Sequence, residues 1–303
     1  MTIIPLKDDA HWHELRRQYI GSSEVAALFG EQPGYAMSLY TLWMVKAGRL
    51  DPPSVENERT KWGIRLESVI AEAIGEMKGW GVIDPEGYYK HPAIEGMGCT
   101  IDRLISDDSH DTFGVLELKN VDYKIWKQQW TGDEPPIHTI LQLQHQLACT
   151  GLSWGAIGGL VGGNHPEAYV YEARPKTIAA IERAVTKFWA SIKANQPPQP
   201  DGTDSTTAAL KALYPESLAG KVLDLTQHNE FPEIVAELKQ SRLDERAAGA
   251  RKKAAENRIY NIIEDAELVM SDGMEILTAK TRHRKGYTVK DTTYREIRLK
   301  ESV

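Results

Sequence analysis

Residues 99–120 read CTIDRLISDDSHDTFGVLELKN, and this stretch decides the fold of the chain. Two runs rich in residues that favour strands, 99–106 and 112–119, flank a polar turn at 107–111. Such a pattern predicts an antiparallel hairpin. Charged side chains interrupt both runs, so chemistry and fold are predicted from the same residues.

Three charged residues of the predicted hairpin fall close together. Glu117 and Lys119 are two positions apart, so their side chains lie on one face of the strand. If the hairpin is symmetric about a four-residue loop at 108–111, Asp102 stands directly opposite Glu117. Opposed residues have Cβ atoms about 4.5–5.5 Å apart, and two carboxylates that close repel unless a positive charge lies between them.

A divalent cation would supply that charge, because carboxylate and carbonyl oxygens suit Mg²⁺ and Mn²⁺. Lys119 could then orient or deprotonate a water molecule. The alternative is a solvated sheet face with a cross-strand ion pair. A slip of one residue in the register would separate the two carboxylates.

Helices and strands alternate on both sides of this hairpin. Residues 62–77 have the apolar spacing of an amphipathic helix. Residues 10–30 also resemble a helix, with Ser22 or Ser23 as a candidate N-cap. The remaining segments predict two helices, 137–150 and 177–192, and two strands, 153–161 and 168–173. The pattern indicates an α/β (α+β) fold with a mixed central sheet flanked by helices.

Composition shifts divide the chain into parts. We expect one domain over 1–195, a linker over 196–207, and a C-terminal extension over 208–303. The extension contains a long charged helical stretch interrupted at Gly249, and a hairpin signal at Ser271-Asp272-Gly273.

Charge and cysteine content exclude several classes of protein. The 303 residues contain 36 Lys and Arg against 43 Asp and Glu, a net charge of −7, which argues against binding through a global positive field. Two cysteines exclude a disulfide scaffold and a four-cysteine metal site. The longest stretch without Asp, Glu, Lys or Arg, 135–166, contains Gln and His, which excludes a membrane span. The first residues contain no apolar run typical of a signal peptide, so we expect a cytoplasmic protein.

Two helices supply further polar candidates. Glu67 lies on the 62–77 helix, where a solvated glutamate is the common alternative. Gln142 and Gln146 are four positions apart and share a helix face, as part of a site or of a polar lattice within the fold. We interpret His138 and His145 as ordinary polar residues, since no third ligand follows at the spacing of a zinc site.

Six short motifs occur in an order that resembles a known family. They are W-H-x-L-R (12–16), I-G-S-S-E-V (20–25), W-G-x-x-x-E (62–67), T-I-D (100–102), L-E-L-K (116–119) and Q-x-Q-H-Q-L-x-x-T-G (142–151). Together they resemble the lambda-exonuclease-like, YqaJ-type viral recombinase nucleases of the PD-(D/E)XK superfamily. The resemblance covers about residues 10–195 and implies a restriction-endonuclease-like core.

The resemblance also implies roles for individual residues. It implies Mg²⁺, with Mn²⁺ as a substitute, bound by Asp102, Glu117, the Leu118 carbonyl and Glu67. Lys119 matches the catalytic lysine, and Gln142 matches a glutamine that supports the site. The residues matching those that hold a DNA 5′-phosphate are Arg16, Ser23 and Thr100.

The sequence departs from the family pattern at two places. Ile101 replaces the proline that precedes the aspartate. A phosphate-binding arginine shortly after E-x-K has no clear counterpart, although Lys124 or Lys127 could substitute.

The activity implied by the resemblance is 5′–3′ degradation of one strand of linear double-stranded DNA. It leaves 3′ single-stranded tails for recombination by single-strand annealing. The resemblance further implies a homo-oligomer, suspected to be a ring-forming trimer, a single-strand annealing protein as partner, and a phage or prophage origin in a bacterial host. An endonuclease or single-strand nuclease of the same fold, and a non-catalytic DNA-binding recombination protein, remain as alternatives.

Overall fold

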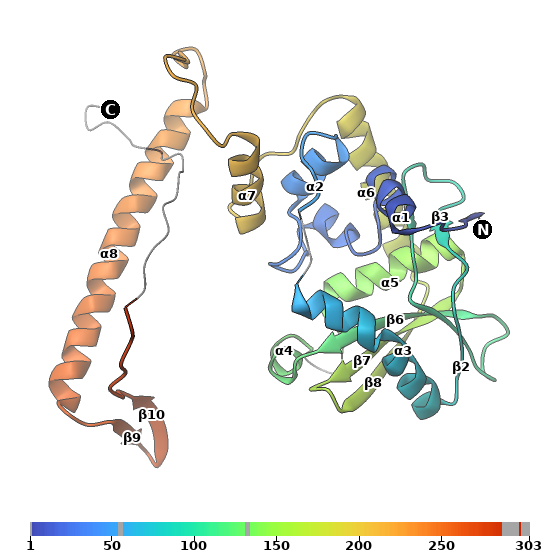
Figure 1. The fold of residues 1–303 in the computed structure, drawn as a ribbon. Coiled ribbons are helices and arrows are strands. Elements are labelled where there is room, and N and C mark those ends of the chain that lie inside the picture. The colour runs from blue at the N-terminus through green and yellow to red at the C-terminus, as the bar shows by residue number, and fades with distance from the viewer. Residues whose placement is uncertain (1, 54–56, 131–133, 287–296, 298–303) are drawn as a thin grey trace. The chain divides into compact units, whose positions relative to one another are not determined.

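The computed structural model describes residues 2–53, 57–130, 134–286 and 297. The chain forms two compact units, Met1–Pro215 and Glu216–Val303 (Figure 1). Each unit has its own sheet, and the first contains the predicted hairpin.

A five-stranded sheet forms the centre of the first unit, in the order β2-β5-β6-β7-β8. Its strands are β2 (Gly81–Ile83), β5 (Arg103–Ser106), β6 (Gly114–Val121), β7 (Trp154–Val161) and β8 (His165–Glu172). The neighbours β6 and β7 are parallel, and every other neighbouring pair is antiparallel. The sheet is therefore mixed, which confirms the predicted fold class.

Helices cover both faces of this sheet. Alternate residues of β6 point to opposite faces. Leu116 and Leu118 pack in one apolar cluster with Ile70 and Ile74 of α3 (Glu58–Lys78). The parallel β6–β7 connection contains α4 (Tyr123–Gln129) and α5 (Ile137–Thr150), as a parallel pair requires a long crossover.

The other face of the sheet carries Val115, which packs in a second apolar cluster with Leu143 of α5. The bounds of α5 agree with the predicted helix at 137–150. The side chains of Glu117 and Lys119 alternate with Leu116 and Leu118, so they face α5 rather than α3.

A smaller layer packs beyond α5. It contains the sheet β1-β3-β4 and several helices. Its elements are β1 (Thr2–Ile4), α1 (Asp9–Gln18), the 3-10 helix η1 (Val25–Phe29), α2 (Leu39–Lys46), β3 (Tyr88–Lys90), β4 (Gly98–Cys99) and α6 (Pro175–Lys193).

The segment predicted to be helical over 10–30 contains two helices, but the predicted N-cap is wrong. Helix α1 ends at Gln18, and η1 starts at Val25. Neither predicted serine is the N-cap of η1, because Glu24 occupies that position. The Glu24 side chain instead accepts a hydrogen bond from the Gly21 N–H, at 2.8 Å, which stabilises a turn between the two helices.

The first unit extends beyond the boundary expected at 196–207. Helix α7 (Asp204–Leu213) begins inside that segment. The Thr206 hydroxyl lies 2.7 Å from the Ser38 hydroxyl, and Ala209 is buried in the main apolar cluster. Because α7 packs against α2 in this way, the first unit continues to Pro215.

The second unit contains one long helix and a hairpin. Helix α8 (Phe231–Ile263) continues through Gly249, so the predicted interruption is wrong. The hairpin of β9 (Leu268–Ser271) and β10 (Met274–Thr278) confirms the turn signal. Asp272 and Gly273 have φ values of 51° and 75°, as a two-residue hairpin turn requires.

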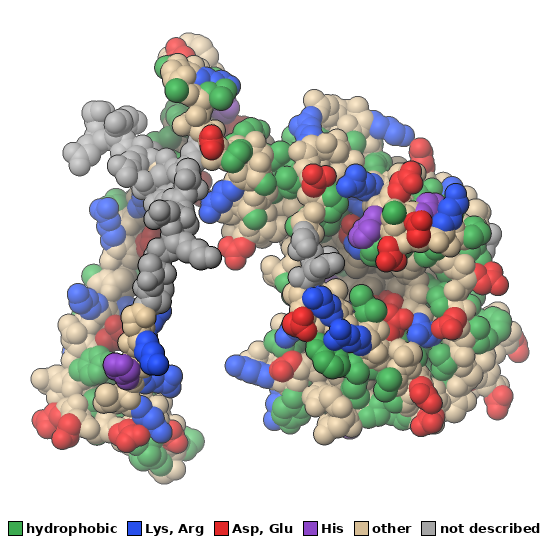
Figure 2. All heavy atoms as spheres, in the orientation of Figure 1, with side chains coloured by type: hydrophobic (Ala, Val, Ile, Leu, Met, Phe, Trp, Pro, Cys, Tyr) green, Lys and Arg blue, Asp and Glu red, His purple; other side chains and the backbone are tan. Residues whose placement is uncertain are grey.

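The surface of the first unit has no face of a single charge sign in the view shown. Acidic and basic side chains are intermixed over it (Figure 2). This distribution agrees with 43 acidic against 36 basic residues in the chain. An anion would therefore bind at a small cluster of basic side chains and not across a whole face of the unit. No helix in the described residues is sufficiently long and apolar to cross a membrane.

Candidate active site

The β5–β6 hairpin has the register that its sequence predicts. Arg103 pairs with Leu116, and Ile105 pairs with Gly114. Continued by one residue, this register sets Asp102 opposite Glu117. The connection is longer than the four residues expected, because β5 ends at Ser106 and β6 begins at Gly114.

Asp102 is fixed to the neighbouring strand. Its Oδ2 atom accepts a hydrogen bond from the Leu118 N–H, at 2.7 Å. Burial and the Glu117 carboxylate raise the pKa of Asp102 to about 8, although Lys119 and the Leu118 N–H act in the opposite direction. The two carboxylates therefore compete for ionisation in a site that favours an additional positive charge.

Glu117 is buried, with 3% of its side chain exposed, and three side chains hold it. Gln142 Nε2 lies 2.7 Å from Oε1, and Gln146 Nε2 lies 2.6 Å from Oε2. Lys119 forms an ion pair with Oε1. Each carboxylate oxygen thus has a donor, which fixes the orientation of the group.

Lys119 completes the cluster, and 30% of its side chain is exposed. Its Nζ lies 3.0 Å from Gln142 Oε1. Burial alone would lower the pKa of Lys119, but the Glu117 and Asp102 carboxylates raise it above its ordinary value. Nearby, burial and the Lys119 charge lower the pKa of His138. The site therefore presents a charged ammonium beside two carboxylates.

Gln146 is a site residue that the sequence left ambiguous. It donates to Glu117 and, at 3.4 Å, to the Thr100 carbonyl. The four-residue spacing from Gln142 was the available signal, because it places both amides on the helix face that meets β6. His145, on the same helix, bonds the Gly98 carbonyl at 3.1 Å and does not contact Glu117.

Glu67, on α3, lies near Asp102. It is held there by an ion pair with Arg103, which the sequence did not indicate. Arg103 Nη1 lies 2.5 Å from Glu67 Oε1, and Arg103 Nε lies 3.1 Å from Asp84 Oδ1. Arg103 directly follows Asp102, and the Glu67 charge contributes to the raised pKa of Asp102. Glu67 therefore lies within electrostatic reach of Asp102, but Arg103 is its direct contact.

The oxygen donors of this cluster suit a hard cation. Within the described part of the chain, no three His, Cys, Asp or Glu side chains already converge on a point that could hold a metal. The continued register places Asp102 opposite Glu117, however, and burial together with the Glu117 charge raises the pKa of Asp102. A divalent cation would offset that repulsion, so the donor set fits Mg²⁺ or Mn²⁺.

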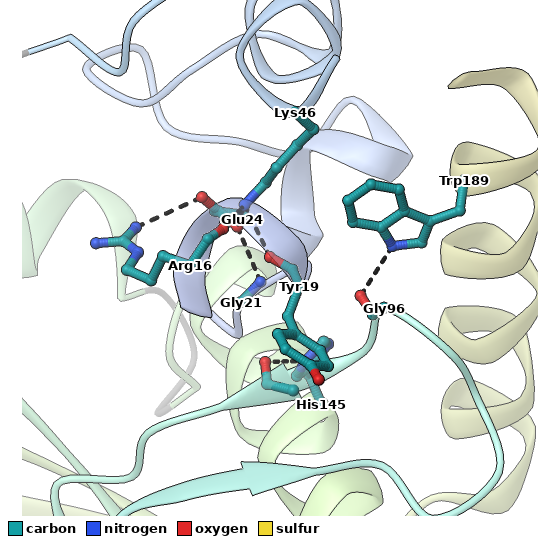
Figure 3. Close-up of polar contacts among 9 residues, drawn as sticks. Arg16, Tyr19, Gly21, Glu24, Lys46, Gly96, His145 and Trp189 are labelled. Carbon is teal, nitrogen blue, oxygen red and sulfur yellow. Dashed lines mark hydrogen bonds and ion pairs between the residues drawn. The ribbon is translucent and has the colours of Figure 1, made fainter. Parts of the chain in front are cut away.

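Two of the candidate phosphate ligands lie on α1 and in the turn after it. Arg16 lies in the last turn of α1, and its guanidinium is 4.7 Å from the centre of the Trp12 ring. Its Nη2 atom also lies 3.5 Å from Glu24 Oε1 (Figure 3). Ser23 is exposed in the turn that follows. The Gly98 N–H donates to the Ile20 carbonyl at 3.2 Å, so this turn adjoins β4.

Thr100 connects the two candidate sites along the chain. It follows β4 directly and lies two residues before Asp102. Its carbonyl accepts the bond from Gln146. The structure thus brings Asp102, Glu117, Lys119 and Gln142 together, and it connects them through Thr100 to the turn that contains Ser23.

Comparisons with known proteins bear on the family and on the fold. Residues 11–153 match the model of the YqaJ-like viral recombinase domain. Among curated proteins, none matches the chain. Among solved structures, an alkaline exonuclease from Laribacter hongkongensis is 24% identical, with a TM-score of 0.51, over 62% of this chain and 94% of that protein.

Two further solved structures show weaker similarity. The same enzyme in complex with dAMP is 23% identical, with a TM-score of 0.49, over 60% of this chain and 92% of that one. A phage-related exonuclease from Haemophilus somnus is 12% identical, with a TM-score of 0.43, over 58% and 96%. At such identities, likeness concerns the fold alone, and we base the fold comparison on the structure with the TM-score of 0.51.

The family match includes every candidate residue named above, from Arg16 to Gln146. Within these residues the structure forms the hairpin, α3 and the polar face of α5. Residues 11–153, just under half of the chain, are therefore similar to the YqaJ-like viral recombinase domain.

Proposed function

We propose that this protein is a metal-dependent 5′–3′ exonuclease of linear double-stranded DNA. It leaves 3′ single-stranded tails for recombination by single-strand annealing. The family match to a viral recombinase domain supports a nuclease of this general type. The polarity, the metal and the recombination step are our proposals.

The observation that carries the proposal is the cluster of Asp102, Glu117 and Lys119. Glu117 is held at both oxygens by glutamine amides, and Asp102 is held by a main-chain N–H. Lys119 keeps its ammonium charged beside them and partly accessible. This charge can orient an attacking water and stabilise negative charge on a phosphodiester in the transition state.

In this proposal Mg²⁺, or Mn²⁺ in its place, is bound by Asp102, Glu117, the Leu118 carbonyl and Glu67. The ion would lower the pKa of a bound water and stabilise the leaving oxygen. Gln142 contacts both Glu117 and Lys119, so it fixes the distance between the carboxylate and the ammonium.

Recognition of the DNA end would set the polarity. Arginine binds phosphate through charge-assisted hydrogen bonds, and a neighbouring hydroxyl can add another. Arg16 and Ser23 supply these groups from adjacent segments, and Thr100 lies two residues before Asp102 on the segment whose Gly98 bonds the Ile20 carbonyl. A terminal 5′-phosphate held there would present the first phosphodiester to the Asp102 and Glu117 cluster.

We further propose that the protein acts as a homo-oligomer, a ring-forming trimer that encircles DNA. Its partner would be a single-strand annealing protein in the cytoplasm of a phage-infected or lysogenic bacterial host. The net charge of −7 is compatible with such a ring, since a local basic channel suffices to bind DNA.

One digestion experiment tests the activity. Linear duplex DNA labelled at the 5′ or the 3′ end, a closed circular duplex and a single-stranded DNA are incubated with Mg²⁺, with Mn²⁺ or with EDTA. Lys119→Ala is compared with Lys193→Ala, a substitution at an exposed lysine paired with Glu95 on the surface.

We expect metal-dependent release from the 5′ ends, no cutting of the circle, and loss of activity in Lys119→Ala alone. Cutting of the circle would show that the protein is an endonuclease and not an exonuclease. Digestion of single strands alone would indicate a single-strand nuclease. DNA binding without cleavage in either metal would support a non-catalytic recombination protein.

A further inference from the structure

A buried ion pair lies behind the candidate phosphate ligands. Lys46 Nζ of α2 lies 2.7 Å from Glu24 Oε2, and the two side chains are 1% and 7% exposed (Figure 3). Burial of two charges is costly unless both have additional partners. The identity of those partners shows which elements the pair holds.

Lys46 holds the end of α1. Its ammonium donates to the Tyr19 carbonyl, at 2.8 Å, and to the Arg16 carbonyl. Carbonyls in the last turn of a helix have no partner within the helix, and a cation there also interacts favourably with the helix dipole. Lys46 therefore fixes the main chain of the turn that carries the Arg16 side chain.

Glu24 holds the next segment and the guanidinium itself. Its Oε2 accepts from the Gly21 N–H at 2.8 Å, which closes the turn that contains Ser23. Its Oε1 lies 3.5 Å from Arg16 Nη2. One carboxylate thus connects the Ser23 turn, the Arg16 head group and Lys46.

The charges of this cluster do not cancel. Arg16 and Lys46 are two cations against one carboxylate. Lys46 is enclosed, whereas 31% of the Arg16 side chain is exposed. The excess positive charge is therefore accessible to an anion at Arg16, next to the exposed Ser23.

We propose that the Glu24–Lys46 pair positions Arg16 and Ser23 for a terminal phosphate at a DNA 5′ end. Lys46 acts through the main chain of Arg16, and Glu24 acts through its side chain and the Ser23 turn. Neither residue of the pair needs to touch the DNA. The inference rests on the proposed function, since it assigns the machinery behind end recognition.

The test compares the same linear duplex with a 5′-phosphate and with a 5′-hydroxyl. The kcat/KM ratio of the two substrates is measured for the wild type and five variants. These are Arg16→Ala, Lys46→Met, the doubly neutral Glu24→Gln/Lys46→Met, the triple variant that adds Arg16→Ala to that pair, and Arg17→Ala as the control. Arg17 is the neighbouring arginine, and it pairs with the exposed Asp51 instead of Glu24. The doubly neutral variant avoids an unpaired buried charge, so it keeps the test valid if Lys46→Met does not fold.

We expect wild type and Arg17→Ala to favour the 5′-phosphate at least tenfold. The neutral variant should lose most of this preference, while its kcat/KM on the 5′-hydroxyl duplex stays within about twofold. Adding the neutral pair to Arg16→Ala should cause no further loss, because the pair acts through Arg16.

Two results would overturn the inference in distinguishable ways. An equal loss on both duplexes, with the preference retained, would make the pair a purely structural element and leave the proposed function standing. A wild-type protein that degrades both duplexes equally would remove 5′-phosphate recognition itself, and the inference with it.

Discussion

Asp102 Oδ2 accepts a hydrogen bond from the main-chain N–H of Leu118, at 2.7 Å. This bond fixes the aspartate against the strand that carries Glu117 and Lys119. Side-chain rotation alone cannot separate the two carboxylates without breaking it. Their mutual repulsion is thus a property of the folded chain, and it makes the site responsive to protons and to cations.

Replacing Asp102 by Asn should raise the thermal stability of the metal-free protein. The pKa of Asp102 is about 8 in the folded chain against an ordinary value of 3.8. Between these values the unfolded chain releases a proton that the folded chain retains, so the stability of the wild type falls as pH rises. Asp102→Asn should remove the contribution of Asp102 to this fall of stability with pH. The charges of Glu117, Lys119 and Glu67, which shift the pKa of Asp102, remain in the variant.

The measurement is Tm in EDTA between pH 5 and pH 8.5, repeated with Mg²⁺. Magnesium should raise Tm in the wild type and have little effect in Asp102→Asn. Asp51→Asn, at an exposed surface position, is the control and should behave as wild type. Identical slopes in all three proteins would contradict the effect of Asp102.

Replacing Gln146 by Leu should destabilise the protein by about 1–3 kcal/mol, because Glu117 Oε2 loses its donor in a buried site. Activity should also fall, since Glu117 can then rotate. Urea unfolding measures the first effect and initial digestion rates measure the second. Gln128→Leu, at an exposed residue of α4, should change neither. Unchanged unfolding in Gln146→Leu would mean that water replaces the amide.

Replacing Glu67 by Gln should weaken metal binding more than turnover. Of the proposed metal ligands, Glu67 is the one whose direct contact is Arg103, so we expect it to bind the ion less closely than Asp102 and Glu117 do. Even groups behind the direct ligands change metal affinity or activity by about 10–100-fold. We expect the Mg²⁺ concentration for half-maximal digestion to rise about tenfold, with most of the rate recovered at saturation.

The control for Glu67 is Glu72→Gln, on the exposed part of the same helix. A fall in the saturated rate, with the half-maximal Mg²⁺ concentration unchanged, would instead assign Glu67 a role outside metal binding.

Replacing Gly96 by Ala should destabilise the first unit by about 2–4 kcal/mol. Gly96 has a φ of 73°, and a Cβ there would overlap the Trp189 indole. Its carbonyl accepts from Trp189 Nε1 at 2.8 Å and from the Ile20 N–H at 2.7 Å (Figure 3). The substitution should therefore displace the segment that leads into the Ser23 turn.

Gly163→Ala is the matched control for Gly96. Gly163 has a φ of 82°, and an added Cβ meets nothing within 4 Å. It should show the cost of backbone strain without the overlap, about 1 kcal/mol. Equal losses of unfolding free energy in the two variants would show that Trp189 moves aside without cost.

Local patterns predicted the hairpin and the main helices well. Equal distances from the loop centre place Asp102 opposite Glu117, and the observed pairing of Arg103 with Leu116 has that register. The apolar spacing over 137–150 also identified α5, since most of that helix is buried. Both features depend on neighbours in sequence.

Features that depend on distant contacts were missed. Ser22 and Ser23 resemble N-caps, but the Glu24 side chain closes the turn and pairs with Lys46, which lies 22 residues further along. The sequence did not indicate the ion pairs of Arg103, because its partners Glu67 and Asp84 lie on α3 and just after β2. The Pro-rich segment before α7 gave no indication that Thr206 would meet Ser38.

The two halves of the active site differ in the sequence separation of the residues that meet in them. The β5–β6 hairpin joins neighbouring segments, whereas Gln142 and Gln146 arrive only after the crossover through α5. Contacts between close segments tend to form early in folding, and long-range pairing comes later. We therefore expect the hairpin to bring Asp102 and Glu117 together before the amides that hold Glu117 are in place. A chain that refolds with divalent cations, or at mildly acidic pH, crosses this step with less repulsion, so the site's electrostatics bear on the rate of folding as well as on catalysis.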